Sequence, residues 1–418
     1  MTTGTTARAQ SGLITPVLIG GSVILMLGFA VRASFGVFQI PIAAEFGWPR
    51  IEFSLAIAIQ NLAWGIGQPA FAAIGERFGD RRAIILGALV YALGLVLSAY
   101  ATTPGELQLW NILIGGGIAG TGFGVILAMV GRAAADRHRS MALGVATAAG
   151  SAGQIIGPPA AEYLLGVMDW PSVFMIFAGV VLSSLMLLPM LRAPGSASRA
   201  GIEESMGTVL RRAVRDPNFT LIFLGFFSCG YQLAFMTAHF PAFVAEVCGA
   251  IDPGGLLAGL GITTTSQLGA WSIGLIGFAN IGGTILAAKL GNHYRKKTLL
   301  ALIYAGRTVL AAWFILVPMT PVTVIVFSLA MGTLWLATVP LTAGLIGTIY
   351  GFRYMGTLFG IVFFSHQLGS FLGVWMGGMF YDLYGSYEAV WWIGVGVGAF
   401  SAIVHLPIRE ARSGLQAA

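Results

Sequence analysis

Twelve apolar segments, each long enough to cross a lipid bilayer, set the main constraint on how this chain of 418 residues can fold. A membrane helix needs about 20 consecutive, mostly apolar residues. Only 9% of the residues are charged, whereas a soluble domain carries about 25%. Lipid must therefore surround most of the chain, so we predict an all-α membrane protein whose helices cross the bilayer. The predicted transmembrane helices are 14–42, 52–74, 83–101, 107–131, 141–166, 173–191, 219–246, 265–289, 298–317, 321–349, 354–380 and 389–408.

The basic residues predict which side of the membrane each loop occupies. With both termini in the cytoplasm, all but three of the 22 Lys and Arg residues fall on the cytoplasmic side or at cytoplasmic helix ends. The exceptions are Arg50 on the outside, and Arg32 and Arg307 within spans. This bias follows the positive-inside rule, so we predict cytoplasmic N- and C-termini. The first span follows Arg8 without an obvious cleavage site and is expected to be a retained helix.

A polar stretch divides the chain into two similar parts. We predict a first six-helix bundle over 1–191, a cytoplasmic linker over 192–218, and a second six-helix bundle over 219–418. Segment 75–84, after span two, matches segment 291–299, after span eight, in character and position. Transporter folds commonly contain such internal repeats.

The loop after span two resembles the signature of the major facilitator superfamily, Gly-x-x-x-Asp-Arg-x-Gly-Arg-Arg. Its acidic, first arginine, glycine and final basic places are filled here by Glu76, Arg77, Gly79 and Arg81. Ala72 and Asp80 depart from the pattern. The resemblance implies two pseudo-symmetric bundles and a charge latch of Glu76, Arg77 and Arg81 that gates their motion. The alternative for these charges is simple anchoring at the cytoplasmic surface.

Other segments are similar to bacterial members of the monocarboxylate-porter branch of that superfamily. They are 32–36, 54–61, 229–232, 239–241 and 365–370. This resemblance implies a bacterial inner-membrane carrier of a small organic anion, often moved together with a proton. One departure is that span eight lacks the arginine of better-known members, since its first basic residue is Lys289 at the cytoplasmic end. A Gly-x-x-x-Gly-Pro motif at 153–158 resembles a motif frequent in proton-coupled exporters.

Arg32 is the most informative single residue, because it lies in an apolar part of span one. A charge at the bilayer centre costs at least ~2.5 kcal/mol, so this side chain must face a water-filled cavity or a partner. A guanidinium suits bidentate binding of a carboxylate. We therefore predict that Arg32 anchors the substrate, with a structural pair to an acid or to carbonyls as the alternative. Arg307 is assigned a structural role, and a second anion contact stays open.

Further polar and aromatic residues within the spans are predicted to complete the site. Those expected to bind substrate beside Arg32 are Phe35, Asn61, Asn111, Tyr231, Gln232, His239, Trp335, His366 and Gln367. Those expected to couple a proton are Glu162, His239 and His366, because burial or an imidazole places titration near neutral pH. Each could instead be a packing residue or join two helices. Predicted helix breaks at 36–41, 158–159, Pro241 and Pro340 favour a site near the bilayer centre.

The leading interpretation is a proton-coupled secondary transporter of a small carboxylate that works by alternating access. The main alternative is a proton-driven exporter of amphiphilic compounds, and a receptor that uses a transporter fold is a third. We expect no enzyme, because no nucleophile–base set or phosphate loop is present. We also expect no cofactor, metal or nucleic acid, and a monomer whose partners are the anion, protons and the lipid bilayer. Cys229 and Cys248 lie ~28 Å apart along a helix and cannot form a disulfide with each other.

Overall fold

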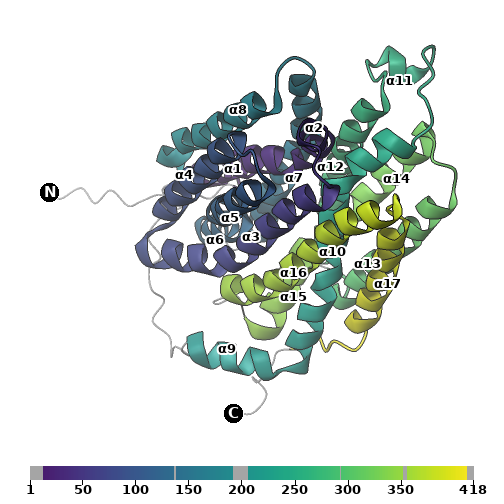
Figure 1. Ribbon diagram of the computed structural model, residues 1–418. Helices are drawn as coiled ribbons and strands as arrows, with labels where there is room; N and C mark the ends of the chain where they lie inside the picture. The colour runs from purple at the N-terminus through teal and green to yellow at the C-terminus, as the bar shows by residue number, and fades with distance from the viewer. Residues whose placement is uncertain (1–12, 136–137, 192–205, 292, 352–354, 412–418) are drawn as a thin grey trace.

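The computed structural model describes residues 13–135, 138–191, 206–291, 293–351 and 355–411, and these form helices and no strand (Figure 1). The helices before the linker are α1 Pro16–Ala33, η1 Phe35–Phe38, α2 Gln39–Phe46, α3 Arg50–Phe78, α4 Asp80–Ala99, α5 Pro104–Thr121, α6 Phe123–Ala133, α7 Arg139–Leu165, α8 Trp170–Ser183 and η3 Ser184–Met190. The later helices, of which α9 lies within the predicted linker, are α9 Met206–Arg215, α10 Pro217–Val247, α11 Leu256–Gly259, α12 Thr265–Leu290, α13 Lys296–Leu316, α14 Pro321–Leu334, α15 Thr338–Tyr350, α16 Met355–Tyr384 and α17 Glu388–His405. The predicted all-helical class is confirmed.

Each predicted span coincides with one helix or with two or three consecutive helices. Ten of these units in the described chain are long and apolar enough to cross a membrane by composition alone. The remaining two, α3 and α7, are 29 and 27 residues long but more polar. Both pack along a helix from the other part of the chain, α3 on α16 and α7 on α12. These two more polar spans therefore lie where the two parts of the chain meet.

Helix starts follow local capping chemistry. Thr103 precedes Pro104 and accepts a hydrogen bond from the backbone N–H of Glu106, whose carboxylate accepts bonds in return. Thr320 and Pro321 begin α14 in the same manner. A side-chain acceptor satisfies a free N–H, and proline at the first position has no N–H to satisfy. These signals fix where the spans begin.

Two of the four predicted helix breaks occur. Span one is interrupted by η1, and span ten is interrupted between α14 and α15. The predicted breaks in spans five and seven are wrong, because α7 continues through Pro158 and Pro159 and α10 continues through Pro241. Pro241 offers no N–H to the carbonyl of Thr237. That carbonyl lies against Gly36 of η1, at a point where any side chain on Gly36 would clash.

The two sets of helices meet along α3–α16 and α7–α12, and Figure 1 shows α3 and α16 side by side. Glycines allow this approach: Gly378 packs on Ser54 and Gly277 packs on Ser151. The 31 residues of α10 connect opposite ends of the molecule. We call the end where α10 starts, beside α9, the α9 end. The end where α10 finishes, before α11, is the α11 end (Figure 1).

Candidate functional site

A central cavity lies between the two sets of helices. Its aromatic walls are Phe29, Trp64, Phe123, Trp335, Phe359 and Phe363. Its polar lining residues are Arg32, Gln154, Thr237 and His366. The open space is about 30 Å³, which holds one or two water molecules but no organic substrate. The structure therefore shows the cavity closed around its own side chains.

Arg32 lies in the last turn of α1, where span one breaks into η1. Its Nη2 donates a hydrogen bond of 3.0 Å to Asn61 Oδ1 on α3, and its guanidinium lies 4.9 Å from the centre of the Trp64 ring. Its Nε has no hydrogen-bond partner. No acidic side chain pairs with Arg32 among the described residues. The guanidinium is thus held by neutral groups, and it keeps donor capacity that faces the cavity.

Trp335 and His366, two other predicted substrate residues, line the same cavity. Trp335 is the first residue after α14, and its indole N–H is buried without a partner. His366 stacks on Phe363, and its Nδ1 lies 3.2 Å from Gln367 Oε1. Gln367 itself is outside the lining, because it packs against Gly65 of α3. The structure therefore brings Arg32, Trp335 and His366 together around one cavity, and Asn61 joins them only through its hydrogen bond with Arg32.

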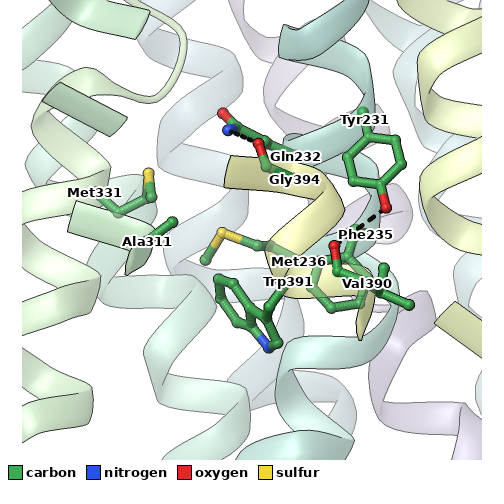
Figure 2. Close-up of a pocket in the computed structure, with 9 residues that line it drawn as sticks. All are labelled: Tyr231, Gln232, Phe235, Met236, Ala311, Met331, Val390, Trp391 and Gly394. Carbon is green, nitrogen blue, oxygen red and sulfur yellow. Dashed lines mark hydrogen bonds between the residues drawn. The ribbon is translucent and has the colours of Figure 1, made fainter. Parts of the chain in front are cut away.

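Tyr231 and Gln232, also predicted to bind substrate, face a separate pocket among α10, α13, α14 and α17 (Figure 2). The hydroxyl of Tyr231 donates to the Val390 carbonyl at 3.2 Å, and Gln232 Nε2 donates to the Gly394 carbonyl at 2.9 Å. This pocket has about 10 Å³ of space, no more than one water molecule needs. Both side chains join helices within the second part of the chain.

Three further predicted residues lie away from the central cavity. Phe35 packs edge-on against Phe174 at 5.8 Å, and Asn111 accepts a hydrogen bond from Gln60 at 2.9 Å. His239 is fully buried; its Nε2 lies 2.8 Å from the Val374 carbonyl, and its Nδ1 lies 3.2 Å from Gln39 Nε2. One neutral tautomer satisfies both contacts of His239.

The α11 end is closed by contacts between the two sets of helices. The carboxylate of Glu162 accepts a hydrogen bond of 2.6 Å from Ser266, which places this predicted proton-coupling residue at the α11 end and outside the cavity lining. Arg50 forms an ion pair with Glu246, and its guanidinium lies 3.7 Å from the centre of the Tyr381 ring. Asp382 accepts the backbone N–H of Arg50 at 3.1 Å. The sequence did not predict this cluster, although Arg50 was noted as the one basic residue on the outside.

Of the three predicted gating residues, the structure describes the side chain of Arg81. The side chains of Glu76 and Arg77 lie outside the described residues. Arg81 donates to the carbonyls of Leu191 and Pro189 at 3.3 and 3.2 Å, so it fastens α4 to the end of η3. Sequence reasoning treated Asp80 only as a departure from the family pattern, yet its carboxylate pairs with Arg132 of α6 at 2.6 Å.

Asn280 of α12 holds two structural features together. Its Oδ1 accepts the backbone N–H of Leu336 at 2.8 Å, and its Nδ2 donates to Ser151 Oγ at 2.7 Å. It therefore provides a hydrogen-bond acceptor for a backbone N–H at the break in span ten, and it also links α12 to α7. No group of three or more His, Cys, Asp or Glu side chains that could hold a metal ion occurs in the part of the chain that the structure describes.

Comparisons with known proteins agree with this architecture. The sequence profile of the Major Facilitator Superfamily matches residues 20–374. An uncharacterized MFS-type transporter, YcxA of Bacillus subtilis, is 25% identical over 392 residues, with 90% of each chain covered. The crystal structure of the transporter FucP in the outward conformation superimposes with a TM-score of 0.63 at 16% identity, covering 94% of this chain and 98% of that one.

Two shorter alignments connect the chain to transporters of different kinds. Monocarboxylate transporter 13 of Bos taurus is 30% identical over 213 residues, 48% of each chain. Multidrug resistance protein MdtH of Proteus mirabilis is 31% identical over 241 residues, 56% of each chain. This chain thus aligns with about half the length of these two proteins. Given the profile match across most of its length and its helical membrane fold, the chain belongs to the Major Facilitator Superfamily of multi-pass membrane transporters.

Proposed function

We propose that this protein is a secondary active transporter that moves a small, monocarboxylate-like organic anion across a bacterial inner membrane in symport with protons. The observation that carries the proposal is the position of Arg32, which lines the central cavity and has no acidic partner among the described residues. A guanidinium offers two parallel N–H donors to a carboxylate, and this bidentate geometry is stronger in a cavity that excludes water.

The lining of the cavity favours an anion over a cation. Arg32 and His366 line it, whereas no Asp or Glu does so in the described chain. A cationic substrate would approach an uncompensated positive charge, which repels it strongly in a medium of low dielectric constant. The surrounding aromatic rings suit the short apolar part of an organic acid.

The small size of the cavity supports a transport cycle in which the two sets of helices move apart. With about 30 Å³ of space, the cavity must widen before a carboxylate can enter. The contacts of Arg50 and Glu162 would hold the α11 end shut while the α9 end opens. The basic residues favour a cytoplasmic α9 end with both termini on that side. Of the three predicted proton-coupling residues, His366 is the one that lines the cavity. We expect the transporter to act as a monomer.

A proton-driven exporter of amphiphilic drugs is the second candidate. The alignment with the multidrug resistance protein MdtH and the aromatic walls of the cavity support it. The alignment with monocarboxylate transporter 13, together with the cavity arginine, supports the first candidate. The two differ in the charge of the substrate, so a transport assay separates them.

The purified protein, reconstituted into liposomes, tests the proposal by counterflow of labelled lactate, pyruvate and larger acids. We expect carboxylate exchange in the wild type, and strong loss of it in Arg32→Ala. The matched control is Arg295→Ala, because Arg295 is an exposed arginine before α13 and should exchange normally. Drug efflux without exchange of any carboxylate would establish the second candidate instead.

A further inference from the structure

A buried thiol faces the break in span ten. Cys229 of α10 and Arg307 of α13 are both 0% exposed. The Cys229 Sγ lies 3.2 Å from Thr338 Oγ1, and Arg307 Nη1 lies 3.6 Å from the same sulfur. Thr338 is the first residue of α15, a helix of 13 residues that no side chain caps at its start. The sulfur therefore lies between a guanidinium and the positive end of a helix dipole.

Arg307 has no carboxylate partner among the described residues. Its Nε and Nη2 are buried without hydrogen bonds, and its other close charge contact is the Tyr304 ring, 5.8 Å from the guanidinium carbon. A buried charge without a counter-charge is strongly unfavourable. Both the guanidinium and the start of α15 would be stabilised by one negative charge at the sulfur, because thiolates form in such electropositive surroundings.

We propose that Cys229 is a thiolate paired with Arg307, and that this thiolate binds the proton that the transporter couples to its anion. The step is a simple protonation: the thiolate takes one proton and becomes a neutral thiol, with no other bond made or broken. The pair then changes from a net charge of zero to one positive charge. The part of the proposal that concerns coupling rests on the proposed function, whereas the thiolate itself does not.

The position of the pair explains how the proton and the anion would help each other to bind. Thr338, which contacts the sulfur, lies between Leu336 and Val339, and both of these line the central cavity. Protonation of the thiolate would leave the charge of Arg307 uncompensated just behind this wall, which attracts an anion into the cavity. By linkage, the bound anion would strengthen proton binding by the same factor.

Two other titratable side chains, His366 of α16 and Tyr304 of α13, also interact directly with the Cys229 sulfur, but they are less suited to this role. Tyr304 in turn stacks on His405 of α17 at 5.1 Å. α15 presents only the uncharged Thr338 to the sulfur. A proton on His366 or His405 would add a second positive charge near Arg307, whereas a proton on the thiolate leaves a single one.

Ultraviolet spectroscopy of the full-length protein in detergent tests the thiolate directly. The sequence has two cysteines, so Cys248→Ser leaves Cys229 as the single thiol without altering its surroundings. We expect absorbance from the thiolate at neutral pH. In Arg307→Gln, combined with Cys248→Ser, this absorbance should be absent at neutral pH. A folded Cys248→Ser protein without thiolate absorbance at neutral pH would overturn the proposal.

Transport measurements in liposomes test the coupling. We expect Cys229→Ser to lose at least ~10-fold in accumulation driven by a proton gradient. Carboxylate counterflow should fall less than this, because serine keeps a polar contact with Thr338 but cannot become an anion in this pH range. Cys248→Ser should accumulate the anion as the wild type does. Proton-driven accumulation that is unchanged in Cys229→Ser would refute the coupling role. If the wild type moved no carboxylate, the proposed cargo would be wrong, and the titration would still decide whether the thiolate exists.

Discussion

The molecule contains two arginines within its spans, and their surroundings differ in an instructive way. Arg32 ends α1, so the negative end of that helix dipole helps to hold its charge without an acid. Arg307 instead contacts Cys229 of α10, whose sulfur lies against Thr338 at the start of α15. The positive end of the α15 dipole adds to the positive charge of Arg307 and does not offset it. Arg32 lines the central cavity, whereas Arg307 is fully buried. A ligand can neutralise a charge that lines a cavity, whereas only other groups of the protein can neutralise a charge that is fully buried.

The largest effect should come from Arg307→Ala. This change removes a large buried side chain, leaves a cavity, and deprives the Cys229 sulfur of its counter-charge. Because the thiol can then become neutral by taking up a proton, the main cost is the cavity, and deleting a large buried side chain costs about 2–5 kcal/mol. The variant should therefore melt at a clearly lower temperature in detergent. Melting is followed by tryptophan fluorescence, with the exposed Arg295→Ala as control. A melting temperature equal to that of the wild type would mean that Arg307 does not contribute to the stability of the folded protein.

Arg32→Ala should show the opposite profile, because it removes a ligand contact and little internal stabilisation. Losing a charge-assisted contact of about 1.5–3 kcal/mol weakens carboxylate affinity roughly 10- to 100-fold. Arg32→Lys should restore only part of it, since an ammonium cannot form the bidentate pair. Asn61→Asp should weaken carboxylate affinity as much as Arg32→Ala does. The new carboxylate at position 61 would pair with the Arg32 guanidinium and compete with the substrate. Affinity is measured by competition in counterflow, and normal affinity in Arg32→Ala would exclude it as the anchor.

The two arginines also differ in how far their surroundings could be predicted from the sequence. The spans and the special status of Arg32 follow from the cost of placing polar groups in lipid, a property of each segment taken alone. The helix break in span ten was expected at Pro340, yet it lies at residues 335–337, where no proline occurs. The side chain of Asn280 satisfies that break from another helix, and no local pattern reports such a partner.

The assignment of polar residues to the substrate shows the same limit. Tyr231 and Gln232 bond to carbonyls of Val390 and Gly394, some 160 residues later in the chain. Cys229 lies 109 residues before Thr338 and 78 before Arg307. Because a polar residue in a span can face the cavity or a distant helix, its identity alone does not decide between binding and packing.

The contacts of Arg50 and of Asp80 extend the comparison to the ends of the bundle. The side chain of Arg50 is 14% exposed, and its ion pair with Glu246 joins the two sets of helices. We expect a coupling energy of about 1 kcal/mol in a double-mutant cycle of Arg50→Gln and Glu246→Gln, followed by thermal melting. Salt should reduce this coupling, because the pair is near the surface. A coupling energy near zero would show that this cluster does not hold the α11 end closed.

The smallest effect should come from the pair of Asp80 and Arg132, even though its 2.6 Å contact is short. The side chain of Arg132 is 37% exposed, so water screens the charge, and exposed pairs contribute about 0–1 kcal/mol. Both residues lie before the linker and would move together when the two sets of helices separate. Asp80→Asn should therefore change melting by less than the Arg50 variants and should leave the carboxylate exchange rate unchanged. If Asp80→Asn slowed exchange more than Arg50→Gln did, the charges at the α9 end, and not the contacts at the α11 end, would control the opening of the cavity.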